Sequence, residues 1–355
     1  MRPRTAAPAW PAGGGRSRVT TTIKDVAARA GLSVMTVSRV LNGERHVSAQ
    51  ARAKVQDAIE ALDFRRNTFA RGLPGSRSFL ICLVIPEMIP AYVAEFQHGA
   101  IESCRAKGYH LVVLPYETGA DATAGGVAGA VASLRPDGFL LLPPITDDQA
   151  VLDVLDRSET PYVRMAPLTE PERASSISMD DAEAARRMTA ALLDLGHRRI
   201  GFFTGPLDHA ASVWRLEGYR RALQERGLAV DTRLVRDGEG VFDGDETEVV
   251  ALLTSPDRPS AIFAFNDEIA LAVMAVAYRL GLSVPGDLSV AGFDDSELSR
   301  LAWPALTTVR QPVFAMAGAA AELVIAQAEA GTRRVEHRRL DFDLMLRDTI
   351  GAPRS

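Results

Sequence analysis

Residues 23–41 have the pattern of two short helices joined by a tight turn, a helix-turn-helix. Apolar residues at i, i+3, i+4 spacing predict the first helix, and Gly31 stands where that helix should end. The hydroxyl of Ser33 can accept a hydrogen bond from the free amides of a second helix that starts at Val34. The residues expected to face inward are Ile23, Val26, Ala27, Val37, Val40 and Leu41. This pattern predicts a small helical unit at the start of the chain.

The outer face of the predicted second helix combines apolar and small polar residues with one arginine. These residues are Val34, Met35, Ser38, Arg39 and Asn42. A short helix with such a face, held by a partner helix across a glycine turn, suits the major groove of DNA. An ordinary helical hairpin would give the same apolar spacing, so this stretch alone leaves both interpretations open.

The residues that follow predict a third helix. Ser48 is placed to cap it, and Val55, Ile59 and Leu62 fall on one side of it. Three such helices would close a small core. This third helix makes the ordinary hairpin much less favoured.

The run from residue 22 to residue 73 resembles the DNA-binding headpiece and hinge of the LacI/GalR (lactose-repressor) family. The string Thr-Val-Ser-Arg-Val-Leu-Asn, characteristic of that family, stands here at residues 36–42, and Asn-Thr-Phe-Ala-Arg-Gly-Leu follows at residues 67–73. The resemblance implies a sequence-specific DNA-binding regulator.

Charge divides the chain into a basic and an acidic part. Residues 1–77 hold 14 Lys and Arg against 5 Asp and Glu, whereas the rest of the chain holds 26 against 40. The basic part will be attracted to phosphate and the acidic part will not. The overall charge of −5 conceals this division.

The sequence lacks signals for other classes of protein. Its longest apolar run, residues 79–86, is far shorter than the ~20 residues that cross a bilayer. Residues 1–18 are rich in Pro, Ala, Gly and Arg without the apolar stretch of a secretion signal, so we expect a disordered extension there. Cys82 and Cys104 have no metal-site or disulfide spacing, which favours the reducing cytoplasm, with the protein on the nucleoid.

An enzymatic function is not favoured by any motif. There is no nucleophile elbow, phosphate loop or two-cysteine metal pair, and the glycines at residues 13–15 precede any strand. We therefore expect no catalytic residue, no metal site and no cofactor.

From residue 79 onward, short apolar runs alternate with helical ones in the βαβ manner. The expected buried parallel strands are residues 79–86, 109–115, 138–142, 161–165, 199–204, 261–265 and 289–293. The expected helices are residues 92–107, 182–195, 213–226, 268–280 and 313–330. Helices of these lengths fit crossover connections that cover both faces of a parallel sheet.

Several motifs of this region resemble the core domain of the same family, so that the likeness covers about residues 19–350. They lie at residues 195–201, 205–207, 266–267, 292–295 and 304–309. The resemblance implies an α/β periplasmic-binding-protein-like core of two doubly wound subdomains, with a small molecule in the cleft between them. The implied domains are a disordered extension (1–19), a helix-turn-helix headpiece (20–66), a hinge helix and linker (67–77) and an effector-binding and dimerisation core (78–350).

The resemblance also assigns DNA contacts. Val34 and Met35 occupy the first base-reading positions, where they could contact thymine methyls. Arg39 occupies the later one, where it could hydrogen-bond guanine O6 and N7. Alternatively, Val34 and Met35 could pack within the headpiece. His46 could be a solvated loop residue without a DNA contact. The expected phosphate or positioning contacts are Thr22, Ser33, Thr36, Ser38, Asn42 and His46.

In the hinge, Leu73 matches the leucine that in this family pairs with its dimer mate and wedges into the minor groove. Asn67 and Ala70 are the accompanying hinge contacts. Here the hinge departs from the usual pattern, because Gly72 costs roughly 1 kcal/mol relative to alanine and Pro74 and Gly75 replace more usual residues. We therefore expect a hinge that orders only on operator DNA.

For the effector, the resemblance points first to Arg215 and Asp294, facing each other across the cleft. A guanidinium donates in a fork and a carboxylate accepts twice, which suits vicinal hydroxyls, while an interdomain ion pair is the alternative. Asn266 is expected to add a contact and Asp267 to cap the helix that follows. The weaker candidates, for which core packing is equally open, are Asp180 and the two stacking walls Tyr92 and Phe242.

Together these features predict a repressor that binds a pseudopalindromic operator as a homodimer. We expect it to respond to a small-molecule effector of the carbohydrate class, with induction favoured over corepression. No leucine heptads follow residue 346, which favours a dimer over a tetramer. The exact ligand stays open, since His209 and Ala211 stand where some relatives have polar contacts and Ala166 where an aspartate is common. The alternative is a small-molecule binding protein without operator-specific regulation.

Overall fold

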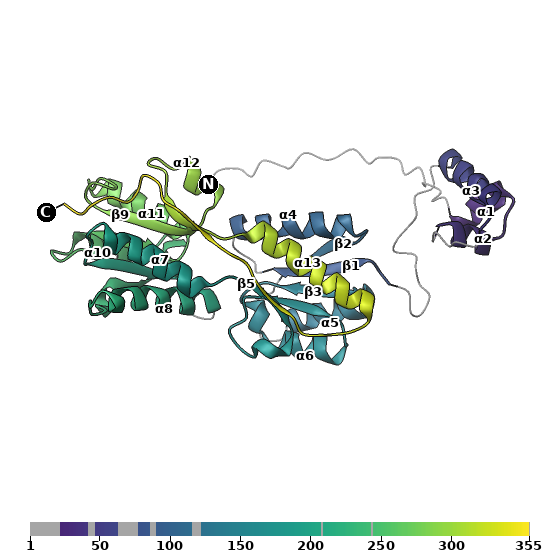
Figure 1. Ribbon diagram of the computed structural model, residues 1–355, viewed down its shortest axis with the longest axis horizontal. Helices are drawn as coiled ribbons and strands as arrows, with labels where there is room; N and C mark the ends of the chain where they lie inside the picture. Colours follow the sequence, from purple (N-terminus) through teal and green to yellow (C-terminus); the bar gives the residue numbers. More distant parts are fainter. Residues whose placement is uncertain are drawn as a thin grey trace, which may run out of the picture. The chain divides into compact units, whose positions relative to one another are not determined.

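The computed structural model of the chain describes residues 22–41, 47–62, 77–85, 90–115, 122–206, 209–242 and 244–354. The chain separates into two compact units, Met1–Ser76 and Arg77–Ser355. Each unit has its own hydrophobic core, and Figure 1 shows the elements of both.

The first unit contains three helices, α1 (Ile23–Ala30), α2 (Val34–Leu41) and α3 (Ala49–Ala61). Val26, Val37 and Val55 are fully buried where the helices meet. The other residues predicted to face inward are buried or pack against this core, as the sequence predicted: Ile23, Ala27, Val40, Leu41, Ile59 and Leu62. α1 ends at Gly31, whose φ of 64° is left-handed, a conformation that glycine adopts without strain.

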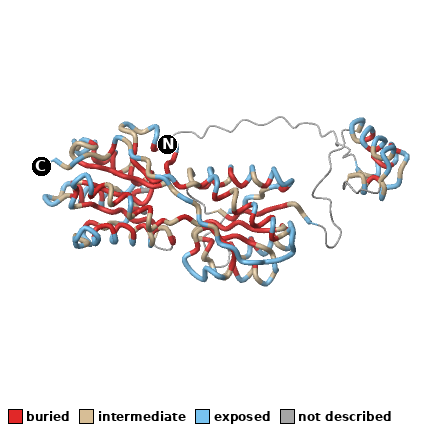
Figure 2. Tube along the Cα trace, in the orientation of Figure 1, coloured by how far each residue is buried: buried red, intermediate tan, exposed pale blue. Residues whose placement is uncertain are grey.

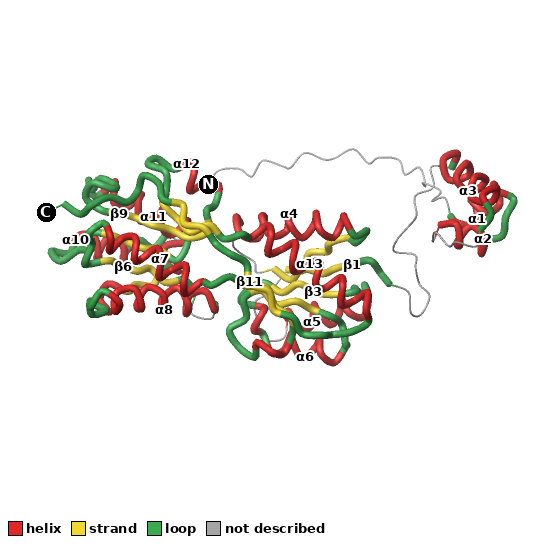
Figure 3. The backbone as a smooth tube through the Cα atoms, viewed as in Figure 1, coloured by secondary structure: helices red, strands yellow, loops and turns green. Residues whose placement is uncertain are grey.

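The second unit contains two six-stranded sheets, each covered by helices on both faces (Figure 3). The strand order of the first sheet is β11-β5-β4-β3-β1-β2. Its strands are β1 (Leu80–Ile85), β2 (His110–Pro115), β3 (Gly138–Leu141), β4 (Tyr162–Met165), β5 (Ser175–Ser178) and β11 (His337–Arg339). One face is covered by α4 (Pro90–Ala106) and α13 (Val313–Ala330), and the other by α5 (Ala122–Ser133) and α6 (Gln149–Arg157).

The second sheet has the equivalent order β12-β10-β9-β8-β6-β7. Among its described strands, only β12 runs antiparallel to its neighbour. Its strands are β6 (Ile200–Thr204), β7 (Val235–Asp237), β8 (Ala261–Ala264), β9 (Ser289–Asp294), β10 (Thr307–Arg310) and β12 (Asp343–Met345). One face is covered by α7 (Asp181–Asp194) and α8 (Ala210–Glu225), and the other by α10 (Thr247–Thr254) and α11 (Asp267–Arg279). Two short helices are α9 (Glu239–Phe242) and α12 (Glu297–Leu301).

The chain passes between the two sheets three times, after β5, after β10 and after β11. Each sheet with its helices therefore forms a doubly wound subdomain, and both subdomains are built from separated stretches of sequence. This confirms the predicted core of two doubly wound subdomains. The central strands are buried throughout and the outer helix faces are exposed (Figure 2).

All seven predicted strands exist, each within one residue of its expected ends, and the five predicted helices begin and end within three residues of theirs. The prediction was wrong about the burial of β2, which is half exposed because it is an edge strand with one neighbour. The apolar pattern gave no signal for β5, which reads Ser-Ser-Ile-Ser, or for the glycine-rich α5.

α13 is the only helix among the described residues that is long and apolar enough to cross a membrane. Half of it is buried, however, and its residues Met316, Ala320 and Val324 form part of the core beneath the first sheet. We therefore interpret α13 as a core helix of the first subdomain.

A buried polar network fixes the loop that follows β9. The Asp267 side chain, which is fully buried, accepts hydrogen bonds from the Thr308 hydroxyl at 2.5 Å and from the Ser296 amide at 2.7 Å. Burial raises the pKa of Asp267 to about 7, although both hydrogen bonds oppose this shift. The prediction that Asp267 caps α11 was wrong, because Asn266 accepts the hydrogen bond from the Ile269 amide at 3.0 Å.

α7 and α8 are in close contact at Gly218. A Cβ atom there would lie 2.0 Å from the carbonyl oxygen of Ala182 on α7. We predict that Gly218→Ala lowers the free energy of unfolding by about 3 kcal/mol, at the upper end of overpacking costs, because backbone cannot rotate away. The measurement is urea unfolding followed by circular dichroism.

Gly125→Ala is the matched control for this substitution. Gly125 lies on the exposed face of α5 with nothing within 4 Å of a Cβ, so alanine there should stabilise the protein by up to about 1 kcal/mol. Equal unfolding midpoints for the two variants would contradict the proposed helix contact.

The pKa of Asp267 predicts a pH-dependent stability. Since about 7 exceeds the roughly 3.9 of an unfolded aspartate, the folded protein binds the extra proton, and stability falls as pH rises, by up to about 1.4 kcal/mol per pH unit. This loss of stability is complete once the pH exceeds about 7. Asp267→Asn removes this titration and can keep both hydrogen bonds, with its oxygen toward Ser296 and its amide toward Thr308.

We therefore expect Asp267→Asn to flatten the dependence of unfolding free energy on pH between about pH 4 and 7. Asp257→Asn, at an exposed position, should keep the wild-type slope. A wild-type slope in the Asp267→Asn protein would show that another group titrates.

Candidate functional site: a DNA-reading helix and an effector cleft

α2 presents the residues predicted to read DNA bases. Val34 and Met35 are 42% and 65% exposed, so they do not serve to pack the headpiece. Arg39 is also exposed on this helix. α2 thus offers two apolar side chains and one guanidinium to a partner.

The predicted phosphate contacts of α1 and α2 lie at the helix starts. The Thr36 amide donates to the Ser33 hydroxyl at 3.1 Å, which confirms the predicted cap, and the Thr22 hydroxyl donates to Asp25 at 2.7 Å. These bonds from Thr22 hold the pKa of Asp25 below its usual value. Ser38 is half-buried on α2. The remaining predicted DNA contacts lie outside the described residues: Asn42, His46, Asn67, Ala70 and Leu73.

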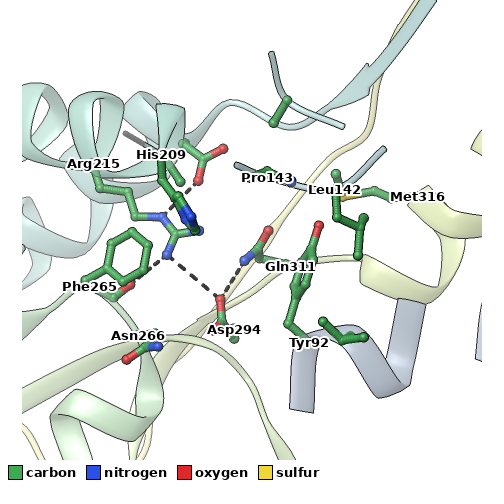
Figure 4. Close-up of a pocket in the computed structure, with 14 residues that line it drawn as sticks. Tyr92, Leu142, Pro143, His209, Arg215, Phe265, Asn266, Asp294, Gln311 and Met316 are labelled. Carbon is green, nitrogen blue, oxygen red and sulfur yellow. Dashed lines mark hydrogen bonds and ion pairs between the residues drawn. The ribbon is translucent and has the colours of Figure 1, made fainter. Parts of the chain in front are cut away.

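A cleft of about 680 Å³, including the part open to solvent, lies between the two subdomains of the core. Several of its residues lie at or just after the carboxyl ends of β3, β4, β8 and β9, where open α/β sheets bind ligands. Figure 4 shows this cleft. Its lining consists of Tyr92, Val93, Leu142, Pro143, Ala166, Asp181, His209, Ala211, Arg215, Phe265, Asn266, Asp294, Gln311 and Met316.

Arg215 is the central charged group of the cleft. Its Nε donates to Asp181 at 2.9 Å, and one terminal nitrogen donates to the Phe265 carbonyl oxygen at 2.6 Å. The guanidinium lies over the rings of Phe293 and Phe265, with its carbon 3.5 Å and 4.6 Å from the two centroids. Arg215 is only 4% exposed, and these contacts hold its side chain in one orientation.

Asp294 lies beside Arg215 on the same wall of the cleft. One Asp294 oxygen is 3.9 Å from Arg215 and accepts a hydrogen bond from Gln311 at 2.5 Å. Burial raises the pKa of Asp294 well above its usual value; the Arg215 charge opposes this shift and the nearby Asp267 and Glu268 reinforce it. The backbone of Asp294 has a φ of 115°, rare for any residue with a side chain.

The prediction that Arg215 and Asp294 face each other across the cleft was wrong. α8 and β9 both belong to the second subdomain, so the two side chains form an ion pair within one wall. The opposite wall is formed by residues of the first subdomain.

The other predicted effector residues divide into three groups. Asn266 and Tyr92 line the cleft, Asn266 from the start of α11 and Tyr92 from α4. The Phe242 side chain lies outside the described residues. Asp180 does not line the cleft: as the N-cap of α7 it accepts from the Glu183 amide at 2.9 Å, and it pairs with Arg339 at 3.0 Å.

The sequence did not single out Asp181 or Gln311. Asp181 takes the place predicted for Asp180, because the cap residue turns its side chain back to the helix while the next residue reaches the cleft. Gln311 follows β10 in a crossing segment and carries no motif of its own. Among the described residues no cluster of His, Cys, Asp and Glu could hold a metal ion.

Comparison with known proteins agrees with this arrangement. A sequence model of bacterial regulatory proteins of the lacI family matches residues 22–67, and one of a periplasmic binding protein-like domain matches residues 189–350. Catabolite control protein A of Priestia megaterium is 33% identical over 307 residues, covering 85% of this chain and 91% of that protein. The ribose operon repressor of Escherichia coli (strain K12) is 33% identical over 327 residues, with 92% and 98% covered.

Solved structures agree as well. The complex of the transcriptional regulator CelR with cellobiose has a TM-score of 0.71 at 32% identity, covering 93% of this chain and 99% of that one. The lac repressor dimer bound to operator and the anti-inducer ONPF has a TM-score of 0.83 at 28% identity, with 94% and 99% covered. The chain, with its helix-turn-helix unit and its two-subdomain core, therefore belongs to the lacI family of bacterial regulatory proteins.

Proposed function

We propose that this protein is a transcriptional repressor that binds a pseudopalindromic operator as a homodimer and is controlled by a small carbohydrate-like effector. The observation that carries this proposal is the presence, in one chain, of an exposed recognition helix and a cleft built around Arg215 and Asp294. We further propose that it has no catalytic activity and acts in the cytoplasm on the nucleoid.

The DNA-binding part of the proposal rests on α2. An arginine in the major groove can bind guanine O6 and N7 together, while Val34 and Met35 can contact thymine methyls but cannot donate hydrogen bonds to base edges. The basic balance of residues 1–77 adds attraction to phosphate without sequence preference. Specificity should therefore depend most strongly on Arg39.

The homodimer is supported by an apolar patch on the second subdomain. Leu298, Leu301 and Trp303, on and just after α12, are 51%, 71% and 88% exposed. Adjacent exposed apolar side chains of this size are typical of protein contact sites. A twofold dimer presents two recognition helices, which requires an operator with two related half-sites.

The effector part rests on the polar wall of the cleft. Arg215 can donate to a ligand oxygen in addition to its contacts with Asp181 and Phe265, and Asp294 can accept from hydroxyls, a combination suited to vicinal hydroxyls. An effector that binds one core conformation better shifts the equilibrium between operator-bound and free states. We propose induction, in which the effector favours the free state.

Selection of operators from random duplexes tests the proposal. We expect the purified protein to enrich a pseudopalindrome, and one member of a sugar pool to release it. Arg39→Ala should weaken binding to the selected operator by about 1–3 kcal/mol, or roughly 5- to 150-fold, with little effect on scrambled DNA.

Arg29→Ala is the control, since it removes the same charge from the exposed face of α1. It should leave the ratio of operator to scrambled affinity unchanged. Equal losses on both DNAs for Arg39→Ala would contradict base reading by Arg39, and no enrichment at all would contradict operator-specific regulation.

Asp294→Asn tests the effector site. Asparagine can still accept the hydrogen bond from Gln311 but offers one acceptor in place of two, so we expect the affinity for the releasing sugar to fall about 10- to 100-fold. Operator affinity without the sugar should stay within about twofold. Titration calorimetry measures the loss, and Asp257→Asn, exposed and remote from the cleft lining, should bind the sugar normally.

A further inference from the structure

The two walls of the cleft differ in chemistry. Figure 4 shows Arg215, His209 and Asn266 on one side and Leu142 and Met316 on the other, with Asp294 and Gln311 between them. The polar groups thus gather on the second subdomain and at the crossing segment. An effector that fits this cleft must therefore have a polar side and an apolar side.

The polar wall offers both donors and acceptors. Arg215 and Gln311 carry N–H donors, and Asp181 and Asp294 carry carboxylate oxygens. Asn266 adds an amide at the start of α11. A row of neighbouring hydroxyls on one edge of a ligand, each of which donates and accepts, fits such a wall.

Among the described residues, the wall of the first subdomain is apolar. Its lining residues are Tyr92, Val93, Leu142, Pro143, Ala166 and Met316, among which the Tyr92 hydroxyl is the one polar side-chain group. A ligand hydroxyl desolvated against this wall would lose its water without gaining a partner.

This apolar wall is preformed. The loop that carries Ala166 is held by Arg164, a fully buried residue whose guanidinium donates to the carbonyl oxygens of Thr169 and Glu170 at 2.8 Å and 2.7 Å. Arg164 also donates to the Thr146 carbonyl oxygen, which ties in the segment just after Leu142 and Pro143. The wall therefore cannot easily rearrange to supply polar groups.

The charges of the cleft oppose an anionic ligand. Arg215 is the only Lys or Arg among the described residues that line it, and its charge is already matched by Asp181 and faced by Asp294. From the described lining, a phosphate group would meet two carboxyl groups and no unmatched arginine or lysine.

We propose that the effector is an uncharged sugar derivative that carries its hydroxyls along one edge and an apolar substituent, such as an alkyl or aryl aglycone, on the opposite edge against Leu142, Ala166 and Met316. This inference rests on the proposed function, in which the cleft binds a carbohydrate-like effector. To that function it adds that the effector carries an apolar substituent, that this substituent faces the wall of the first subdomain, and that the effector is uncharged.

The experiment compares ligands that share one sugar. Glucose, galactose, mannose and xylose are each tested as the free sugar and as methyl, propyl and phenyl glycosides of both anomers, with the 6-phosphates of the three hexoses. Binding to the full-length protein is measured by titration calorimetry. For the sugar that binds, we expect affinity to rise about fourfold per added methylene, which corresponds to about 0.8 kcal/mol, and the 6-phosphate to bind more weakly than the free sugar.

Ala166→Asp converts the apolar wall into a polar one. Ala166 has a φ of 42°, a conformation that aspartate tolerates better than alanine, so the substitution should not disturb the loop. We expect it to abolish the gain from propyl and phenyl groups and to leave the free sugar bound at least as well as before. Ala128→Asp, on the exposed face of α5, adds the same charge outside the cleft and should keep the wild-type ligand preference.

The outcomes separate this inference from the proposed function. Free sugar bound as tightly as its glycosides, or tighter binding of a 6-phosphate, would overturn the inference and leave a sugar-controlled repressor intact. Binding of no sugar or glycoside, with operator selection successful, would overturn the inference together with the carbohydrate effector. An unchanged glycoside preference in Ala166→Asp would show that the substituent does not face this wall.

Discussion

The buried positive charge of Arg215 imposes conditions on everything around it. An ionised group away from water is costly unless it is paired and hydrogen-bonded, and loss of one partner of a buried pair typically costs about 3–5 kcal/mol. Asp181, the Phe265 carbonyl oxygen and two aromatic rings meet this requirement together. These groups come from α7, α8, β9 and the residue after β8. The requirement therefore joins four parts of the second subdomain into one fixed polar wall.

Sequence reasoning succeeded where a local rule decides the structure. Gly31, Ser33 and Ser48 end or start helices through their own backbone and hydroxyl chemistry, and each was predicted correctly. Continuous apolar runs likewise revealed the central strands, since a strand covered on both faces has no polar side. β5 is one of these covered strands but is built largely of serine, so its burial left no apolar signal.

The errors at the cleft have a different origin. Asp180 and Asp181 are adjacent and chemically identical, and only the geometry of a helix start decides which one caps the helix and which one lines the cleft. The wall on which Arg215 and Asp294 lie depends on three chain crossings that no local pattern records. Gln311 was missed for the same reason, because its importance comes from its place in a crossing segment and not from a motif.

The position of Gln311 also connects ligand binding with the relative placement of the two subdomains. Gln311 follows β10 of the second sheet and precedes α13, which covers the first sheet, and its amide donates to Asp294. A ligand that takes up the acceptor capacity of Asp294 must compete with or extend this hydrogen bond, and one that touches Met316 contacts α13 itself. Any preference of the ligand for one arrangement of these groups is then a preference for one relative placement of the two sheets. By linkage, the same free energy also shifts any other binding equilibrium that depends on the relative placement of the two sheets.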